Sequence, residues 1–344
     1  MGNPSRKMTI MNESILSIIG NTPLVRLNRV FDNLHFNLYA KLESLNPGGS
    51  MKDRPALNII RHGLATGEIE PGAVVIESSS GNMGIGLAQA CSYYDLRFIC
   101  VVDPKTTEQN IRLLRAYGAE VDIVTRPDPE TGEFLKARID RVKELLETVE
   151  NSFWPNQYSN EFNPLAHYMT MEEIVNALDG RVDYVFCATS TCGTLRGCAE
   201  YVKNTGLGTK VYAVDALGSV IFGGQKSKRL IPGHGAAMRP ALFNDNLADR
   251  SIHVTDRECV IGCRRLARRE AIMAGGSSGA ILMAVERVKD EIPRGANCAM
   301  ILPDRGERYL ETIYSDSWVT ANFGYIENNW EIPMEAETCV MATY

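Results

Sequence analysis

Strand-like and helix-like segments alternate along this chain of 344 residues. Short apolar runs typical of buried strands occupy residues 73–77 (AVVIE), 96–103 (LRFICVVD), 183–189 (DYVFCAT), 210–216 (KVYAVDA) and 297–304 (NCAMILPD). Segments of helical character follow two of these runs, at residues 83–94 and 195–205. Because strands that alternate with helices usually lie parallel in one sheet, the sequence predicts an α/β fold class.

The composition excludes several classes of function. A net charge of −6 and a pI near 5.6 argue against a nucleic-acid partner, which would need a basic surface. No apolar run is long enough to cross a membrane, and the first residues lack the apolar core of a signal peptide. The nine cysteines and five histidines follow no metal-ligand spacing. We therefore expect a cytoplasmic protein with reduced thiols and no metal, long enough for two domains.

The segment SLNPGGSMKDRPA, residues 44–56, presents a lysine at the start of a helix. Ser50 and Asp53 have the spacing of a helix start signal, and Pro55 is tolerated only in a first turn, so the helix should begin near Lys52. The helix dipole disfavours an ammonium group at this end and lowers its pKa. The placement suits a lysine that forms a Schiff base better than a charged residue on a solvated helix.

Two polar turns each lie between a predicted strand and a helix. The first is SSSGNMG at residues 78–84, and the second is STCGT at residues 190–194. Such turns present backbone N–H groups at a helix N-terminus, where phosphates and carboxylates bind. Neither turn is a G-x-G-x-x-G fingerprint or a Walker loop, so neither indicates a nucleotide. Either turn alone could be an ordinary connection, but two of them together with Lys52 predict an anion-binding enzyme site.

These motifs resemble those of the fold-type II pyridoxal-phosphate enzymes, the cysteine synthase and cystathionine β-synthase family. The similarity covers residues 16–319, and its motifs are IIGNTPLVRL (18–27), NPGGSMKDRPA (46–56), SSSGNMG (78–84), STCGT (190–194), AGGSSGA (274–280) and LPDRGERYL (302–310). The resemblance implies a fold like that of tryptophan synthase β, with two three-layer α/β/α domains and pyridoxal 5'-phosphate between them. It also implies a homodimer, and it assigns LPDRGERYL to a strand that closes the cofactor site.

The resemblance also implies a discontinuous division of the chain. A smaller, mobile domain would comprise residues 46–156 and would carry the loop that binds the substrate carboxylate. A larger domain would comprise residues 12–45 and 157–325 and would hold the cofactor phosphate. The tail, residues 326–344, has no assigned role.

Individual roles follow from the resemblance by position. Lys52 would hold the cofactor as an internal aldimine and act as the general base. Asn82 would bind the cofactor ring oxygen, and Ser277 would face the pyridine nitrogen. Because a serine hydroxyl cannot protonate that nitrogen as an aspartic acid could, the site favours β-elimination and replacement through an aminoacrylate. The phosphate would lie against Ser190, Thr191, Cys192, Gly193 and Thr194, and the substrate carboxylate against Ser78, Ser79, Ser80 and Gln157.

The choice of substrates depends on departures from cysteine synthase. Met83 stands where that enzyme typically has threonine, and the chain resembles a branch that makes a 2,3-diaminopropionate precursor for siderophores or peptide antibiotics. That branch uses O-phosphoserine as donor and the amine of glutamate as nucleophile. Such anions call for arginines, of which we favour Arg138, with Tyr158 beside it. Arg229 and Arg239 are the other candidates. The alternatives are cysteine synthase itself and a catalytically silent homologue.

Overall fold

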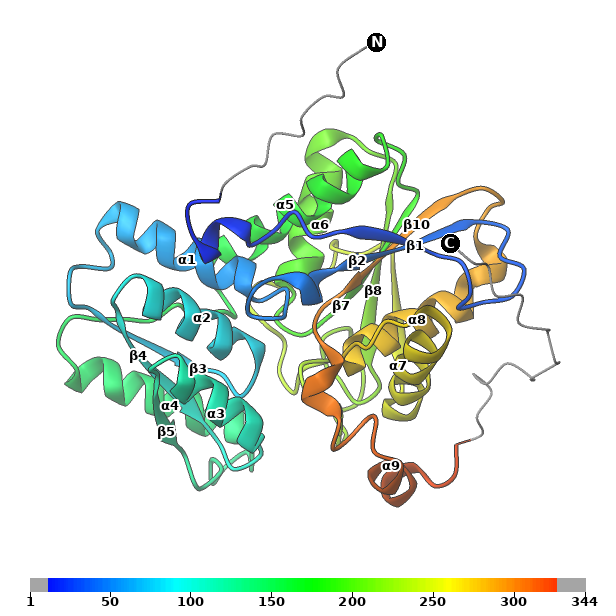
Figure 1. Ribbon diagram of the computed structural model, residues 1–344. Helices are drawn as coiled ribbons and strands as arrows, with labels where there is room; N and C mark the ends of the chain where they lie inside the picture. Colours follow the sequence, from blue (N-terminus) through cyan, green and yellow to red (C-terminus); the bar gives the residue numbers. More distant parts are fainter. Residues whose placement is uncertain (1–11, 327–344) are drawn as a thin grey trace, which may run out of the picture.

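The computed structural model describes residues 12–326, and Figure 1 shows two sheets with helices packed around them. The six-stranded sheet has the order β1-β2-β10-β7-β8-β9, and the four-stranded sheet has the order β5-β4-β3-β6. All strand pairs are parallel except β1 with β2. The strands are β1 (Leu24–Leu27), β2 (Asn37–Leu42), β3 (Val74–Ser78), β4 (Arg97–Val102), β5 (Glu120–Ile123), β6 (Ser152–Phe153), β7 (Tyr184–Ala188), β8 (Lys210–Ala216), β9 (Arg250–Val254) and β10 (Asn297–Leu302).

Helices cover both faces of each sheet, which gives two three-layer units. Buried side chains of α7 and α8 pack on one face of the six-stranded sheet, and those of α5 and α6 pack on the other. In the four-stranded unit, α1, α2 and α3 cover one face and α4 covers the other. The helices are α1 (Asp53–Thr66), α2 (Asn82–Tyr93), α3 (Glu108–Ala116), α4 (Phe134–Thr148), α5 (Phe162–Ala177), α6 (Gly193–Thr205), α7 (Asp256–Glu270), α8 (Gly276–Val288) and α9 (Asp316–Phe323).

The structure confirms the α/β class, with β3, β4, β7, β8 and β10 at the strands expected from the sequence. The expectation of a strand over residues 302–310 is wrong: β10 ends at Leu302, and a 3-10 helix, η4, follows at Gly306–Tyr309. The chain makes only isolated bridges here, from Asp304 to Ser50 and from Arg305 to Ala274. Strand pairing ends after Leu302 because the chain turns toward the carboxyl ends of the strands. This turn brings Asp304 to the lysine segment.

The four-stranded sheet lies wholly between residues 74 and 153, inside the expected smaller domain. The boundaries 46–156, and 12–45 with 157–325, remain our proposal. Residues 327–344 of the expected tail lie outside the part of the chain that the structure describes. Within residues 12–326, no helix is long and apolar enough to cross a membrane. The eight cysteines of this part are buried and free.

Polar turns follow β3, β7 and β10 at the carboxyl ends of these parallel strands. Residues 79–81 join β3 to α2, residues 189–192 join β7 to α6, and residues 303–305 follow β10. In open α/β sheets the carboxyl ends of the strands are where ligands bind. The fold therefore places the predicted site residues at one end of each sheet.

Candidate active site

Lys52 lies immediately before α1, as the sequence predicts, and its backbone is fixed on both sides. Its N–H donates to Ser50 Oγ at 3.2 Å, and its carbonyl accepts from Ala56 N at 3.1 Å. On the other side is α2, because a Cβ built on Gly86 would lie 3.0 Å from the Lys52 carbonyl oxygen. Glycine at this position lets α2 approach the lysine closely. The side chain of Lys52 is half-buried.

Burial lowers the pKa of Lys52 from 10.5 to about 8, while the charge of Asp304 works in the opposite direction. The sequence predicted this direction, but from the helix dipole. In the structure the largest cause is desolvation, which disfavours the ammonium form. An amine with a pKa near 8 is in part neutral at physiological pH, so it is able to act as a nucleophile and as a base.

Asp304 connects the parts of the site, and the sequence analysis did not single it out. It is 2 % exposed, and its Oδ2 accepts from Asn82 Nδ2 at 2.8 Å and from Tyr309 OH at 2.6 Å. Its carbonyl accepts from Gly275 N at 3.3 Å, in the turn before Ser277. Its Oδ1 has no hydrogen-bond partner among the described residues. Asp304 thus joins the Asn82 turn, through its carboxylate, to the turn before Ser277, through its backbone carbonyl, and its charge acts on Lys52.

Asn82 is the first residue of α2, one residue before the start expected from the sequence, and is half-buried. Arg308 donates to its Oδ1 and to the carbonyl of Gly48. Together with Asp304, Arg308 fixes which end of the Asn82 amide faces which neighbour. Ser277 is the second residue of α8 and keeps 8 % of its surface exposed, whereas Ser278 is fully buried. The contacts of Asn82 fix its amide beside Asp304, and Ser277 lies in the first turn of α8.

The turn expected to cradle the phosphate, Ser190 to Thr194, ends β7 and opens α6. The first N–H groups of a helix have no acceptor within it, so they are available to a phosphate. Cys192 has a φ of 65°, a left-handed conformation that glycine adopts more easily. A Cβ on Gly193 would lie 2.2 Å from Asn163 Oδ1. Thr194 Oγ1 contacts Met51 Sδ at 3.9 Å, which ties the turn to the lysine segment.

The serines expected to bind the substrate carboxylate lie at the end of β3 and before α2. Ser78 is buried, with an Oγ that has no partner within residues 12–326, and Ser80 is half-buried. Ser79 Oγ accepts from Gly84 N at 2.9 Å, so this hydroxyl also caps the helix. Gln157 Nε2 donates to the Ser78 carbonyl at 3.2 Å. The structure therefore places Gln157 directly beside the serine turn.

Arg138 and Tyr158 both interact electrostatically with one buried carboxylate beside the serine turn. That carboxylate is Glu77, which accepts from Ser78 N at 2.7 Å and Gln157 N at 3.1 Å. Arg138 and Glu77 both affect the pKa of Tyr158, which burial raises. Arg138 lies on α4, is 8 % exposed and pairs with Asp103 at 3.2 Å. Its Nη1 has no hydrogen-bond partner in the described part of the chain, which leaves a buried donor for an anion.

The other candidates lie on the long loop between β8 and β9. Arg229 donates from Nη1 to the carbonyl of His234 at 2.7 Å, and Arg239 lies over the Phe243 ring at 5.0 Å. Both contacts stabilise the loop itself. His234 is 1 % exposed, and burial lowers its pKa to about 3, so it is neutral at physiological pH. Arg138 remains our preferred candidate over Arg229 and Arg239.

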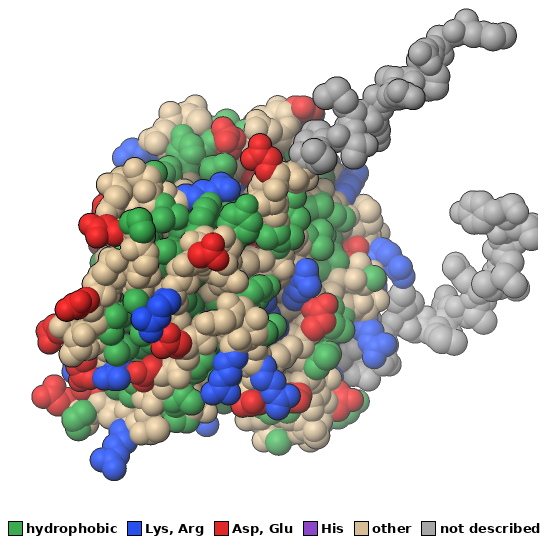
Figure 2. Space-filling model, turned by 60° about the vertical axis from the view of Figure 1, so that its left-hand side comes forward, with side chains coloured by type: hydrophobic (Ala, Val, Ile, Leu, Met, Phe, Trp, Pro, Cys, Tyr) green, Lys and Arg blue, Asp and Glu red, His purple; other side chains and the backbone are tan. Residues whose placement is uncertain are grey.

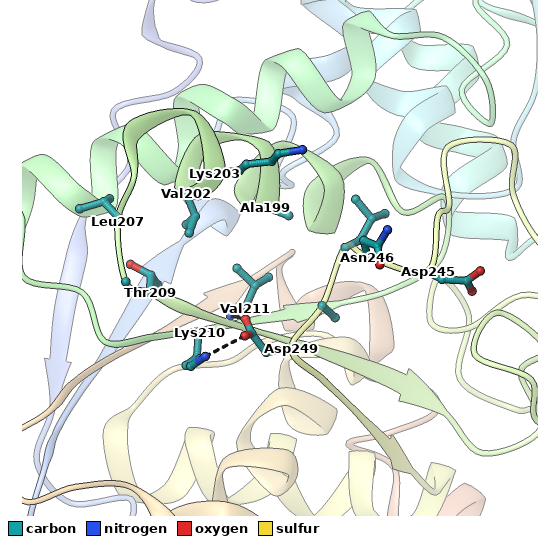
Figure 3. Close-up of a pocket in the computed structure, with 13 residues that line it drawn as sticks. Ala199, Val202, Lys203, Leu207, Thr209, Lys210, Val211, Asp245, Asn246 and Asp249 are labelled. Atoms are coloured by element: carbon teal, nitrogen blue, oxygen red, sulfur yellow. Dashed lines mark hydrogen bonds and ion pairs between the residues drawn. The ribbon is translucent and has the colours of Figure 1, made fainter.

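A separate surface pocket of about 470 Å³ is shown in Figure 3. It is formed by the end of α6, the start of β8 and residues 245–249, and Lys210 pairs with Asp249 across it at 3.0 Å. Because β8 starts here and ends near the polar turns, the pocket opens at the opposite end of the sheet. It contains none of the predicted site residues.

The residues present fit pyridoxal phosphate. Lys52 offers a half-buried amine, the turn at residues 190–194 offers helix N–H groups, and Ser78 and Asp304 have buried oxygens without partners among the described residues. A bulky anionic ring compound with an aldehyde, such as pyridoxal phosphate, would bind to all of these groups. Within residues 12–326, no three His, Cys, Asp or Glu side chains lie together as a metal site would require.

Comparison with known proteins points to the same chemistry. The sequence profile described as "Pyridoxal-phosphate dependent enzyme" matches residues 15–304. The chain is 46 % identical over 308 residues to the N-(2-amino-2-carboxyethyl)-L-glutamate synthase of Ralstonia nicotianae, which covers 89 % of this chain and 91 % of that protein.

Solved structures agree. The O-acetylserine dependent cystathionine β-synthase of Helicobacter pylori superimposes with a TM-score of 0.83 at 32 % identity, covering 89 % of this chain and 100 % of that chain. The cysteine synthase of Entamoeba histolytica superimposes with a TM-score of 0.83 at 32 % identity, covering 91 % and 94 %. The chain therefore belongs to the family of pyridoxal-phosphate-dependent enzymes, in its fold-type II class, and pyridoxal 5'-phosphate is its cofactor.

Proposed function

We propose that this protein is a transferase that joins O-phospho-L-serine to L-glutamate and releases phosphate. The product is N-(2-amino-2-carboxyethyl)-L-glutamate. In this reaction the bond from Cβ to the phosphate oxygen breaks, the glutamate nitrogen bonds to Cβ, and that nitrogen loses a proton. The observation that carries the proposal is the 46 % identity, over most of both chains, to the Ralstonia nicotianae synthase of that name. The solved structures of the cystathionine β-synthase and the cysteine synthase are each 32 % identical to this chain.

The bound cofactor supplies an electron sink that stabilises negative charge at the substrate Cα. Lys52 is the residue proposed to hold the cofactor and to move the Cα proton, and its lowered pKa lets it act as a base. Asp304 fixes the Asn82 amide, which is proposed to lie against the cofactor ring. The hydroxyl of Ser277 would face the ring nitrogen without protonating it, which suits loss of a β-substituent rather than transamination.

The substrates are proposed to be held mainly by the smaller domain, with Gln157 and Tyr158 contributed by the start of the second segment of the larger domain. Ser78, Ser79, Ser80 and Gln157 would bind the donor carboxylate, with the phosphate of the cofactor held at residues 190–194. Arg138 would bind an anionic group of the substrates through its free Nη1, with Tyr158 beside it. Its guanidinium is already oriented by Asp103, so little side-chain entropy is lost on binding.

An ion pair between the two units favours a closed arrangement over the site. Lys226, on the loop after β8, pairs with Glu133, which precedes α4, at 2.5 Å. The pair lies between the loop of the six-stranded unit and a helix of the four-stranded unit. We propose that the smaller domain closes on the substrate in this way and excludes water from the reacting atoms.

We also propose a cytoplasmic homodimer that serves 2,3-diaminopropionate synthesis for a siderophore or a peptide antibiotic. Apolar side chains are exposed near the start of the chain and on α5, and Leu165 and Met169 are 49 % and 54 % exposed one helical turn apart. Figure 2 shows hydrophobic side chains gathered on the upper part of one face. Such a surface favours a second copy of the chain as its cover. Analytical ultracentrifugation of the purified protein tests the dimer.

A competition assay tests the proposed reaction. The purified protein receives O-phosphoserine, O-acetylserine, glutamate and sulfide together, and mass spectrometry identifies the products. The proposal predicts the glutamate adduct as the main product and its absence with Lys52→Ala. Cysteine as the main product would favour the alternative, a cysteine synthase. A colourless protein without product would indicate a silent homologue.

A further inference from the structure

Four buried charged side chains form a network beside the lysine segment. Arg54 donates from Nε and Nη2 to both oxygens of Glu43, at 2.7 and 2.8 Å. The same guanidinium donates from Nη1 and Nη2 to both oxygens of Glu173, at 2.6 and 2.7 Å. Lys41 Nζ completes the network, at 2.6 Å from Glu173 Oε2. We call these four residues the Arg54 cluster.

The Arg54 cluster is almost completely shielded from solvent. The exposed fractions of the side chains are 3 % for Lys41, 4 % for Arg54, 0 % for Glu43 and 14 % for Glu173. Two positive and two negative side chains balance one another, as buried charges require. Burial alone would raise the pKa of Glu173, but the hydrogen bonds and charges of Arg54 and Lys41 lower it to about 2. Glu173 is therefore ionised in the cluster.

Three of its members lie between residues 41 and 54, and the fourth, Glu173, is 119 positions beyond Arg54. Lys41 is on β2, Glu43 on the 3-10 helix η2 (Glu43–Leu45), Arg54 on α1 and Glu173 on α5. The segment before β1 joins them, because Thr22 Oγ1 donates to Glu43 Oε1 at 2.7 Å. Figure 1 shows α1, α5 and β2 meeting where the two units join. The cluster thus fixes the chain at the point where it crosses from one unit into the other.

Lys52 is two residues before Arg54, in the same first turn. The backbone of Lys52 lies between Ser50 on one side and Gly86 of α2 on the other. Neither of these contacts fixes the rotation of α1 about its axis. The guanidinium of Arg54, which is bidentate to both carboxylates, fixes this rotation. Two parallel hydrogen bonds to each carboxylate define a plane as well as a distance.

We propose that Arg54 is a positioning residue, which with Glu43 and Glu173 sets the rotation of the first turn of α1 and so the direction in which the Lys52 amine projects. The inference depends on the proposed role of Lys52 but not on which substrates the enzyme uses. A lysine in place of Arg54 keeps the positive charge but has no planar fork, so it cannot pair with both carboxylates in this way.

The test compares Arg54→Lys with Arg97→Lys, the same substitution in an exposed ion pair, where Arg97 and Glu120 are 62 % and 55 % exposed. Affinity of each apoprotein for pyridoxal phosphate is measured by its absorbance change, without substrate. The fraction fixed to Lys52 by borohydride is measured by peptide mass spectrometry, and the melting temperature of each apoprotein is recorded. We expect Arg54→Lys to bind the cofactor at least tenfold more weakly, with less of it fixed to Lys52, and Arg97→Lys to match the wild type.

A purely stabilising role predicts a different result. Arg54→Lys would then melt earlier but, below its melting temperature, would bind and fix the cofactor as the wild type does, and the proposal would be overturned. If Arg54→Lys does not fold, Glu173→Gln replaces it, since it keeps the shape and loses only one charge; the same loss of fixation is expected, and normal fixation would overturn the proposal. Because no substrate is present, these results stand whichever product the enzyme makes.

Discussion

One added methyl group tests the proposal that the turn at residues 190–194, the phosphate turn, holds the cofactor phosphate. In Gly193→Ala the added Cβ would lie 2.2 Å from Asn163 Oδ1, and all atoms around it are buried. Asn163 cannot move freely, because its Nδ2 donates to the Gln157 carbonyl at 2.8 Å. Overpacking of this kind costs about 1–3 kcal/mol, and loss of that hydrogen bond about 1–3 kcal/mol more. We therefore expect a total destabilisation of about 2–6 kcal/mol.

The matched control is Gly208→Ala, because no atom lies within 4 Å of a Cβ built on Gly208. It should change stability by less than about 0.5 kcal/mol. Urea unfolding measures both free energies, and titration with pyridoxal phosphate measures the affinity of both apoproteins. Gly193→Ala should also bind the cofactor at least about tenfold more weakly, since tenfold corresponds to only about 1.4 kcal/mol. If Gly193→Ala matches the control in both measurements, the proposed position of the phosphate turn is refuted.

Four further predictions follow from single residues or contacts. The rate at which the apoprotein takes up cofactor should rise with pH and level off above about pH 8, because the neutral amine of Lys52 reacts and its pKa is about 8; stopped-flow absorbance measures this. Asp304→Asn should move that inflection to lower pH, because the charge of Asp304 raises the pKa of Lys52, and an unchanged profile would contradict the assignment. Arg138→Lys should raise KM for O-phosphoserine about tenfold, with little change for O-acetylserine, in steady-state assays. Lys226→Gln should change the free energy of unfolding by less than about 1 kcal/mol in urea, because its pair with Glu133 is partly exposed.

The parts of the site that depend on local sequence were predictable. Pro55 and the Ser50 signal place the start of α1 at Lys52, and the polar turns follow apolar strands whose carboxyl ends must meet in a parallel sheet. The lowered pKa of Lys52 was predicted from the helix dipole, whereas its largest cause in the structure is burial, and the degree of burial depends on how the two units pack. No local pattern gives that packing.

The parts that depend on distant contacts were not predictable from one sequence. Asp304 reaches Asn82 across 222 positions of the chain, and Arg54 reaches Glu173 across 119. An aspartate after a strand is an ordinary turn residue until the fold brings a partner to it. The left-handed conformation of Cys192 was also hidden, since cysteine gives no sign of it. For LPDRGERYL, the resemblance predicted a strand, and the chain instead forms a bridge and a 3-10 helix.

The central claim is that the amine of glutamate replaces the phosphate of O-phosphoserine at Cβ. Labelling tests it most directly: the holoenzyme receives O-phosphoserine and glutamate labelled with nitrogen-15 at the α-amine. Mass spectrometry follows the label, and phosphorus NMR follows the phosphate. The account predicts one adduct that retains the label, formed in equal amount with inorganic phosphate and absent with Lys52→Ala. Phosphate release without a labelled adduct would contradict it.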